Sequence, residues 1–500
     1  MDTRVPSSSH DLDVADPAEL GRLSETIDRL LPELERFMAA DGPDLAVADR
    51  AAWLAALDRP LPDDGAGLDV LTDELERWVI PYGLRTPEPG FMAYIIGRAT
   101  TATLASGIAA QVAGHFRYFL TSFSFLEELS LHWLADLCRI PPDTFGVYSS
   151  GGSTANLIGL GAARQAAFER IDVDVAADGI PGGVRGRIYG GSEVNHTIQR
   201  AIGVLGLGRR AFFAVDTDPS GRMAAESLDA RLRNDRAEGV LPIAIVAMAG
   251  TTATGAIDDI DAIADVAAAH GVWLHVDGAY GLPAAGLPEL VDDFQGVERA
   301  DSWIVDPHKW LGTPAGCGAT YVRDGELLER AFTQEPAPYL EAFSPESARS
   351  QFDDQGIHWF DRSVELSSPS RGIWVWAALR EIGAEGMRRR FRRHIALARH
   401  LADRAQGDPR LELLDPPQLS ICCFRYRRDG LTEAQLDSLN TLIVQTLRAE
   451  ENLVPSTARI DGRLAIRACI VNPATRLAEI NELADKVVEI GDRAAAGTIG

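Results

Sequence analysis

Residues 243–277 read IAIVAMAGTTATGAIDDIDAIADVAAAHGVWLHVD, and this stretch decides the fold class of the chain. An apolar run at 243–249 is followed by an amphipathic stretch at 258–270 and a second apolar run at 272–276. Strands buried on both faces of a parallel sheet are continuous apolar runs, and the helix that connects them is amphipathic. The stretch therefore predicts a strand, a helix and a parallel strand, the repeating unit of an α/β domain.

Outward from this unit, the same alternation extends from about residue 91 to residue 372, with further apolar runs at 302–305 and 319–322. We therefore predict one large α/β domain with a mainly parallel sheet over residues 91–380. The alternation is interrupted at 333–370, where polar residues, prolines and glycines predict a long loop of the kind usually kept for function.

Two smaller units are expected on either side of the large domain. Residues 1–90 have helical apolar spacing at 23–37 and 68–80 but too little core to fold alone. We predict a helical segment that wraps another subunit or lobe. Residues 381–500 predict a small α+β domain. Its expected elements are helices at 387–404, 433–450 and 476–492 and strands at 420–426 and 463–471.

The composition excludes several classes of function. The 500 residues include 73 acidic and 48 basic side chains, a formal net charge of −25 that would repel nucleic acids and anionic membranes. No apolar run approaches the roughly 18 residues of a membrane-spanning helix, and residues 1–10 lack the apolar core of a signal peptide. The five cysteines have no metal-ligand spacing. We therefore expect no metal site, and buried thiols in a reducing cytoplasm.

Residues 149–157, SSGGSTANL, open an amphipathic stretch that predicts a helix over 157–170. Glycines such as Gly152 and hydroxyl residues such as Ser153, at the start of a helix, can cradle a phosphate through backbone N–H groups. The segment is neither a G-x-G-x-x-G fingerprint nor a P-loop. From the residues alone, a serine that caps a helix after a turn is an equally good interpretation.

A carboxylate stands at the end of the second apolar run. In WLHVDGAYG, residues 273–281, Asp277 follows the run and precedes small residues. Ligands of open parallel sheets lie at the carboxyl ends of the strands, which makes Asp277 a candidate site residue. The alternative is that Asp277 is a turn residue or a helix cap.

Lys309 follows another predicted strand, within DPHKW at residues 306–310. A lysine amine forms Schiff bases with carbonyl groups, which an arginine guanidinium cannot do. The chain has 46 arginines and two lysines, so a lysine kept here indicates that the amine itself is required. A solvated surface charge is the usual role of a lysine, and Lys486, on a predicted helix face, shows that this argument has exceptions.

His196, in VNHT at residues 194–197, follows a short strand-like run and precedes an amphipathic stretch. Its imidazole could stack on a planar ring or could cap the helix that follows. Together, the candidates provide a phosphate cradle, a carboxylate for a ring nitrogen, a stacking imidazole and an imine-forming lysine. Pyridoxal phosphate requires all four.

Five segments occur in the order and spacing of a known family, namely SGGSTANL, VNHT, AGTTATGAID, HVDGAYG and DPHKW. In these segments the chain resembles the group II pyridoxal-phosphate decarboxylases, which include the aromatic-L-amino-acid, histidine and glutamate decarboxylases. The resemblance covers about residues 91–380. It implies a fold-type I transferase-like architecture with a mainly parallel seven-stranded sheet in the large domain. It also implies an obligate homodimer with active sites at the interface.

The resemblance implies roles for individual residues as well. Lys309 would carry the cofactor as a Schiff base, Asp277 would pair with the pyridinium nitrogen, and His196 would stack on the ring. Arg467 is a weaker candidate for binding the substrate carboxylate, because an ordinary strand arginine is an equally good interpretation. The other expected cofactor contacts are Gly152, Ser153, Thr251, Asp306 and His308, and the expected substrate contacts are Tyr94 and Ile95.

One position departs from the family pattern. Family decarboxylases usually have a loop tyrosine that reaches the partner subunit's site and protonates the α-carbon after carbon dioxide leaves. An ungapped reading back from Trp376 puts Trp359 at this place, and residues 341–380 contain no tyrosine. Because an indole N–H is not a useful acid at neutral pH, His358, water or Lys309 would have to supply the proton. Slow protonation favours reaction with dioxygen, and family members with a non-acidic residue at this place resemble aldehyde synthases.

The expected substrate wall, FMAYIIG at residues 91–97, has fewer aromatic side chains than is usual in aromatic decarboxylases, which weakens the case for an aromatic substrate. We predict a cytoplasmic enzyme that uses pyridoxal phosphate to decarboxylate an L-amino acid to its amine. The first alternative is oxygen-dependent oxidative decarboxylation or deamination on the same cofactor. The second is a non-catalytic dimer that acts as a binding partner, which the intact cofactor residues argue against.

Overall fold

The computed structural model describes residues 22–39, 49–114, 121–333 and 359–497. Its large domain contains a seven-stranded sheet of β2 (Phe145–Ser149), β3 (Gly186–Gly191), β4 (Phe212–Val215), β5 (Leu241–Met248), β6 (Trp273–Asp277), β7 (Ser302–Val305) and β8 (Gly318–Val322). The order across the sheet is β2-β8-β7-β6-β5-β3-β4. Only β8 runs antiparallel to its neighbours in this sheet. The prediction of a mainly parallel, seven-stranded sheet is therefore confirmed.

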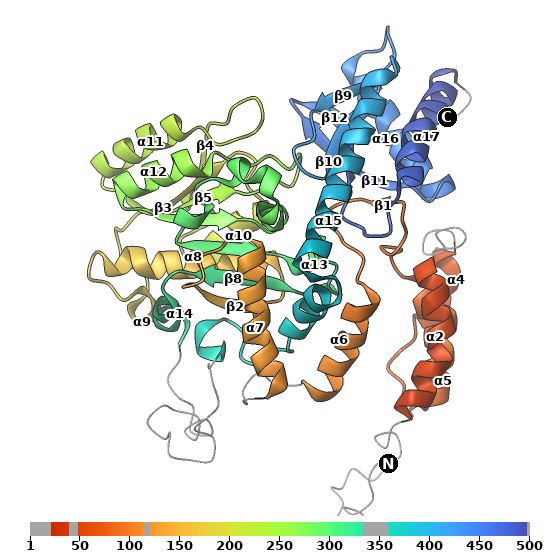
Figure 1. The fold of residues 1–500 in the computed structure, drawn as a ribbon, viewed down its shortest axis with the longest axis horizontal. Helices are drawn as coiled ribbons and strands as arrows, with labels where there is room; N and C mark the ends of the chain where they lie inside the picture. The colour runs from red at the N-terminus through yellow and green to blue at the C-terminus, as the bar shows by residue number, and fades with distance from the viewer. Residues whose placement is uncertain (1–21, 40–48, 115–120, 334–358, 498–500) are drawn as a thin grey trace, which may run out of the picture.

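Helices cover both faces of this sheet. In Figure 1, α11 (Ala225–Ala237) and α12 (Ile260–His270) lie near β4 and β3, and α8 (Gly152–Glu169) crosses the view between β3 and β8. Close packing of α8 requires Gly159, since a Cβ atom there would lie 2.7 Å from Cε1 of His275. Further helices of the domain are α6 (Thr101–Ala113), α7 (Ser122–Leu137), α9 (Val175–Asp178), α10 (His196–Val204), α13 (Pro307–Trp310) and α14 (Gly325–Phe332).

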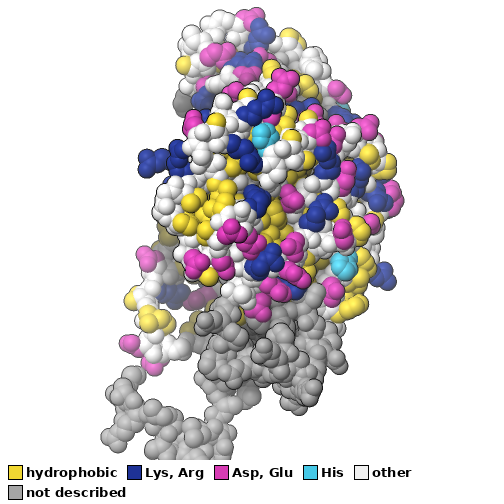
Figure 2. Space-filling view, turned by 90° about the vertical axis from the view of Figure 1, so that its left-hand side faces the viewer, with side chains coloured by type: hydrophobic (Ala, Val, Ile, Leu, Met, Phe, Trp, Pro, Cys, Tyr) yellow, Lys and Arg dark blue, Asp and Glu magenta, His cyan; other side chains and the backbone are white. Residues whose placement is uncertain are grey.

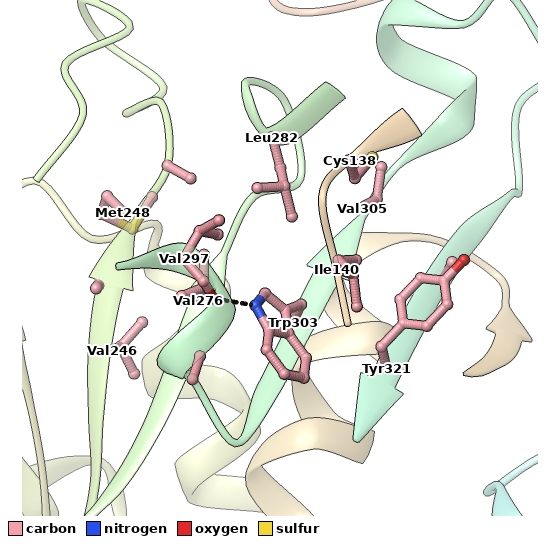
Figure 3. Packing of buried hydrophobic residues seen from close by; sticks show 14 of the residues in the cluster. Cys138, Ile140, Val246, Met248, Val276, Leu282, Val297, Trp303, Val305 and Tyr321 are labelled. Carbon is pink, nitrogen blue, oxygen red and sulfur yellow. Dashed lines mark hydrogen bonds between the residues drawn. The ribbon is translucent and has the colours of Figure 1, made fainter. Parts of the chain in front are cut away.

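The strand–helix–strand unit predicted from residues 243–277 is present as β5, α12 and β6, and its two strands pair in parallel. The helix has clear end signals. Asp259 accepts a hydrogen bond from the N–H of Ala262 at 3.1 Å, and Gly271 ends the helix at φ +58°, a conformation that favours glycine. Figure 3 shows Val276 and Trp303 packed in the core, where the Trp303 indole donates to the Val297 carbonyl at 2.7 Å.

A second, five-stranded sheet has the order β1-β11-β12-β10-β9. Its strands are β1 (Phe91–Met92), β9 (Leu411–Asp415), β10 (Ile421–Tyr426), β11 (Val454–Ile460) and β12 (Arg463–Cys469), and it packs with α16 (Glu433–Glu450) and α17 (Leu477–Ala495). The long helix α15 (Gly372–Gly407), kinked at Gly383, connects the two sheets. Strand β1 pairs in parallel with β11, so residues 91–92 extend the C-terminal sheet. This pairing places the segment after residue 92 beside the small domain.

The N-terminal helices α2 (Leu23–Ala39), α4 (Arg50–Leu57) and α5 (Leu68–Glu74) stand apart from both sheets in Figure 1. They expose large apolar side chains, among them Leu23, Leu31, Leu34, Leu54, Leu57, Val70 and Leu71. On the face drawn in Figure 2, acidic and basic side chains are intermixed. The part of the chain that the structure describes has no helix that is long and apolar enough to cross a membrane.

Candidate active site

The predicted phosphate cradle is the first turn of α8. The sequence predicted a helix from residue 157, but the helix begins at Gly152, immediately after Gly151 at φ +135°. The N–H groups of a first helical turn have no intrahelical partner, which makes them donors for an anion. A Cβ atom at Gly152 would lie 2.5 Å from Oδ2 of Asp306, and one at Gly318 would lie 2.9 Å from Oδ1. Glycine is therefore needed at residue 152 on α8 and at residue 318 on β8, because a larger side chain would collide with the Asp306 carboxylate.

A cavity of about 330 Å³ lies between this cradle and the carboxyl ends of β6 and β7. Six residues that the sequence proposed for the cofactor line it together: Gly152, Ser153, Asp277, Asp306, His308 and Lys309. They come from three separate turns of the large domain, after β2, β6 and β7. The parallel sheet brings these turns to one edge, where the sequence predicted Asp277 and Lys309 to lie.

Lys309 lies in α13, with its Nζ atom 3.1 Å from Oδ2 of Asp306. The Lys309 side chain is 19% exposed and Asp306 is buried. The other carboxylate oxygen of Asp306, Oδ1, is buried without a hydrogen-bond partner in the described chain. A buried acceptor without a donor indicates that a bound group completes the site.

Asp277 ends β6 and faces the same cavity while almost fully buried. Its Oδ2 atom accepts from the side-chain amide of Asn156 at 3.0 Å, and its Oδ1 atom accepts from the backbone N–H of Ala279 at 3.1 Å. Two N–H donors stabilise the anionic carboxylate. Asp277 can therefore act as the fixed negative partner of a cationic ring nitrogen.

A larger cavity, of about 900 Å³, opens on the other side of Lys309. It shares Asn195, Thr252 and Lys309 with the smaller cavity. The candidates Tyr94, Ile95, His196 and Arg467 line it, together with apolar residues of four segments: Leu84, Phe91, Ala93, Val194, Val444 and Val454. Lys309 therefore lines both cavities.

Arg467, on β12, is buried and binds three backbone carbonyl groups. Its Nη1 donates to Tyr94 O at 2.7 Å and to Ser456 Oγ at 3.1 Å. Its Nε donates to Ala253 O at 3.0 Å and its Nη2 to Thr252 O at 2.6 Å. The contact with Tyr94 holds a residue in the left-handed region, at φ +55°. Since a guanidinium has five N–H donors, at most one remains for a substrate carboxylate.

The structure does not bring every predicted residue to these cavities. Thr251 is buried with its hydroxyl accepting from the N–H of Ala256 at 3.0 Å, while its neighbour Thr252 lines both cavities. Trp359 packs against Phe145, with ring centroids 5.6 Å apart, and lines neither cavity in the described chain. His358 lies outside the described residues.

Sequence reasoning missed two groups next to Asp277. Asn156 was part of the quoted SGGSTANL segment but received no role, because the helix was expected to begin at residue 157. A helix from Gly152 places residues 152 and 156 one turn apart on the same face. His275 precedes Asp277 by two positions, so both side chains are on one face of the strand. The helical spacing of residues 152 and 156 and the strand spacing of residues 275 and 277 could have identified Asn156 and His275 from the sequence.

The site fits pyridoxal phosphate, because it combines helix N–H donors, a hydrogen-bonded carboxylate and a lysine amine in one cavity. Residues 52–427 match the family model described as the pyridoxal-dependent decarboxylase conserved domain. The chain belongs to this family. It is an enzyme whose cofactor is pyridoxal phosphate, which confirms the resemblance in its sequence.

The relatives that the chain resembles are named for two kinds of activity, decarboxylation and aldehyde synthesis. The chain is 28% identical over 443 residues to an aromatic-L-amino-acid decarboxylase of Bacillus atrophaeus, covering 87% of this chain and 88% of the relative. It is 27% identical to a phenylacetaldehyde synthase of a Rosa hybrid cultivar, covering 82% and 81%. Its fold matches the crystal structure of Oryza sativa TDC with PLP and tryptamine, with a TM-score of 0.84, 24% identity and coverage of 96% and 100%.

Proposed function

We propose that the protein decarboxylates an L-amino acid with an apolar side chain to the corresponding amine. The observation that carries this proposal is that Lys309 lines both a polar cavity beside the first turn of α8 and a larger, mostly apolar cavity. A cofactor held in the first cavity and a substrate side chain held in the second would both reach the Lys309 amine.

On the cofactor side, each residue has a separate task. Lys309 would hold the carbonyl carbon of the cofactor through its amine, the first turn of α8 would hold the phosphate, and Asp277 would pair with the ring nitrogen, since all three line one cavity. His196 lines the larger cavity, beside Asn195 and Thr252, which line both cavities, and we keep its stacking on the ring as part of the proposal. Pyridoxal phosphate supplies the electron sink that takes up the electron pair released when the bond between Cα and the carboxylate breaks.

On the substrate side, most of the wall is apolar, while Glu193 and Arg448 also line the cavity, and we take the apolar part to hold the substrate side chain. Leu84, Phe91, Ile95 and Val454 provide surface without hydrogen-bonding groups, and an apolar group is stabilised when it leaves water for such a surface. We assign Arg467 to shaping this wall, because its carbonyl contacts hold the Tyr94 and Thr252 segments together. Binding of the substrate carboxylate by Arg467 is limited to its one remaining N–H.

Oxidative chemistry is the second candidate, and the position of Trp359 favours it. Its indole packs against Phe145 of its own chain, so this side chain supplies no acid to the cavities beside Lys309 within one subunit. Without an acid that protonates Cα rapidly after carbon dioxide leaves, the electron-rich Cα would persist longer and could react with dioxygen. The balanced reaction converts an amino acid, dioxygen and water into an aldehyde, carbon dioxide, ammonia and hydrogen peroxide.

Product analysis separates the two candidates. The purified holoenzyme would be incubated with a panel of L-amino acids, and carbon dioxide, amine, aldehyde, ammonia and peroxide would be measured. Our proposal requires an amine in equal amount to carbon dioxide for apolar substrates, and no peroxide. Aldehyde with stoichiometric ammonia and peroxide would support the second candidate and overturn the first. Carbon dioxide from acidic amino acids alone would contradict the assigned substrate class.

We also propose that the chain works as a homodimer in the cytoplasm. The exposed apolar side chains of α2, α4 and α5 support an N-terminal segment that packs on a second copy. The five cysteines are buried free thiols, which is typical of a reducing compartment. Sedimentation of the full chain tests the dimer, and a monomer at micromolar concentration would contradict it.

A further inference from the structure

Next to Asp277, buried polar side chains form a continuous series of hydrogen bonds that ends at its carboxylate. Trp273 Nε1 donates to Ser302 Oγ at 2.8 Å, and Ser302 Oγ lies 2.7 Å from Nδ1 of His275. His275 Nε2 lies 2.8 Å from Oδ1 of Asn156, whose Nδ2 donates to Asp277 at 3.0 Å. All five residues are less than a tenth exposed.

Three secondary-structure elements contribute to this series. Trp273, His275 and Asp277 alternate along β6, so their side chains share one face of the sheet. Ser302 begins β7 and is the register neighbour of His275, and Asn156 reaches the same face from α8. The series of hydrogen bonds therefore connects the sheet and its covering helix to the carboxylate of the active site.

The direction of every hydrogen bond follows from the Asp277 end, where the carboxylate oxygen accepts from the NH₂ group of Asn156. The amide oxygen of Asn156 therefore faces Nε2 of His275 and accepts there, and Ser302, whose oxygen accepts from Trp273, donates its own hydrogen to Nδ1. His275 Nδ1 is then the acceptor, and Nε2 carries the ring proton and donates to Oδ1 of Asn156. This contact holds the amide with its NH₂ group, and not its oxygen, facing Asp277.

The surroundings of His275 agree with a neutral ring. The side chain is fully buried, and Gly159 leaves the space that the ring fills. Burial lowers the pKa of His275 to about 4, and of the groups that shift it only the Asp277 carboxylate acts in the opposite direction. A neutral imidazole has one N–H, so its tautomer is set by the amide oxygen of Asn156, which accepts from Nε2.

We propose that Trp273, Ser302, His275 and Asn156 are positioning residues that hold the Asp277 carboxylate in place for the cofactor's ring nitrogen. The inference rests on the role of Asp277 given under the proposed function. Loss of the Ser302 hydroxyl would leave Nδ1 of His275 without its donor, so the ring would no longer be held against the Asn156 amide. A less firmly held amide would donate less well to the Asp277 carboxylate.

Two variants with a matched control test the proposal. Ser302→Ala removes the hydroxyl of the series, whereas Thr320→Val removes an equally buried hydroxyl that donates to Ala155 O on the same helix. We expect Ser302→Ala to weaken binding of pyridoxal phosphate to the apoenzyme about tenfold and to shift the absorption band of the holoenzyme, and Thr320→Val to do neither. Asn156→Asp, which cannot donate to Asp277, should weaken binding about 100-fold.

Equal effects of Ser302→Ala and Thr320→Val on cofactor affinity would overturn the proposal, because general loosening of the core would then explain both. Thermal unfolding of the apoenzymes checks that the two variants are equally folded. Unchanged affinity in Ser302→Ala or in Asn156→Asp would overturn it as well.

A measurement on the wild-type holoenzyme does not depend on how any test variant folds. Nitrogen-15 NMR of histidine-labelled protein, with the His275 signals assigned by their absence in His275→Gln, should show protonated Nε2 and bare Nδ1 from pH 6 to pH 8. The opposite tautomer, or a doubly protonated ring, would contradict the proposed series of hydrogen bonds and overturn the proposal. This result is independent of substrate and product, so it remains interpretable even if the proposed reaction fails.

Discussion

The two cavities that meet at Lys309 differ in their chemistry and in the way the chain builds them. The smaller is polar, and its walls are turns that follow strands of one sheet in the large domain. The larger is mostly apolar, and its walls come from the segment around Phe91, the start of α10, and α16, β11 and β12 of the small domain.

The difference separates a task fixed by the cofactor from a task that varies with the substrate. A phosphate, a ring nitrogen and a carbonyl carbon require particular groups at particular places, and turns at one sheet edge position them rigidly. An apolar side chain requires only surface of the right shape, which several distant segments can supply. Damage to the smaller cavity should therefore stop the chemistry, whereas damage to the larger should change substrate affinity.

The largest effect is expected at Lys309. Lys309→Ala removes the amine of the residue that lines both cavities, so activity should fall by about 10²- to 10⁴-fold, the range for losing a positioned proton-transfer group, and the visible absorption band should disappear. Lys486→Ala is the matched control, because Lys486 lies on α17 and is ion-paired with Glu451 and Glu489. Its activity and spectrum should equal those of the wild type. An unchanged spectrum in Lys309→Ala would contradict the assignment.

The next effect is expected at Asp277. Asp277→Asn keeps the shape of the side chain but removes its charge, so a cationic ring nitrogen loses its partner. The turnover number kcat should fall by about 10²-fold or more while KM changes little, because the larger cavity is untouched. Steady-state kinetics measure both quantities. A rise in KM with normal kcat would instead place Asp277 in substrate binding and erase the contrast between the cavities.

The contrast also explains how far the sequence could predict the molecule. The cofactor residues were predictable because each follows an apolar strand in a short motif, as Asp277 and Lys309 do. The carbonyl contacts of Arg467 were not, because they join β12 to segments more than 200 residues earlier in the chain. Strand β1 was missed for a similar reason, since it pairs with β11 across the domain boundary. Pairings between segments far apart in the sequence cannot be predicted from the local periodicity of apolar residues.

A smaller effect is expected at Arg467. Arg467→Met removes the contacts with Tyr94, Thr252 and Ala253, so KM should rise about tenfold and the free energy of unfolding should fall by roughly 1–3 kcal/mol. Affinity for pyridoxal phosphate should stay within about twofold. Arg463→Met is the control, because Arg463 lies on the same strand but pairs with Glu412 away from both cavities. Loss of cofactor affinity with unchanged KM would contradict this division of labour.

The smallest effect concerns the core beside the smaller cavity. Burial lowers the pKa of His275 from its ordinary 6.5 to about 4. Between these values the unfolded chain binds a proton that the folded chain does not, so the free energy of unfolding falls as the pH falls through this window. Buried His394, whose pKa burial lowers well below 6.5, adds to the trend. Buried Asp258, whose pKa burial raises to about 6, opposes it because its folded form binds the proton first.

His275→Gln isolates the contribution of His275 to this trend. Urea unfolding at pH 8 and pH 5 should show that the wild type loses about 2 kcal/mol more than the variant over this interval. If the two proteins lost the same free energy, His275 would not be held neutral in the folded chain.

The central claim is that Lys309 joins the two cavities as the attachment point of the cofactor, and one experiment tests it most directly. The holoenzyme would be reduced with sodium borohydride, digested and mapped by mass spectrometry. Because the chain has only two lysines, the outcome has few possibilities. The account predicts the added mass of the reduced cofactor on the peptide with Lys309 and none on the peptide with Lys486. An adduct on Lys486, or on neither lysine, would contradict it.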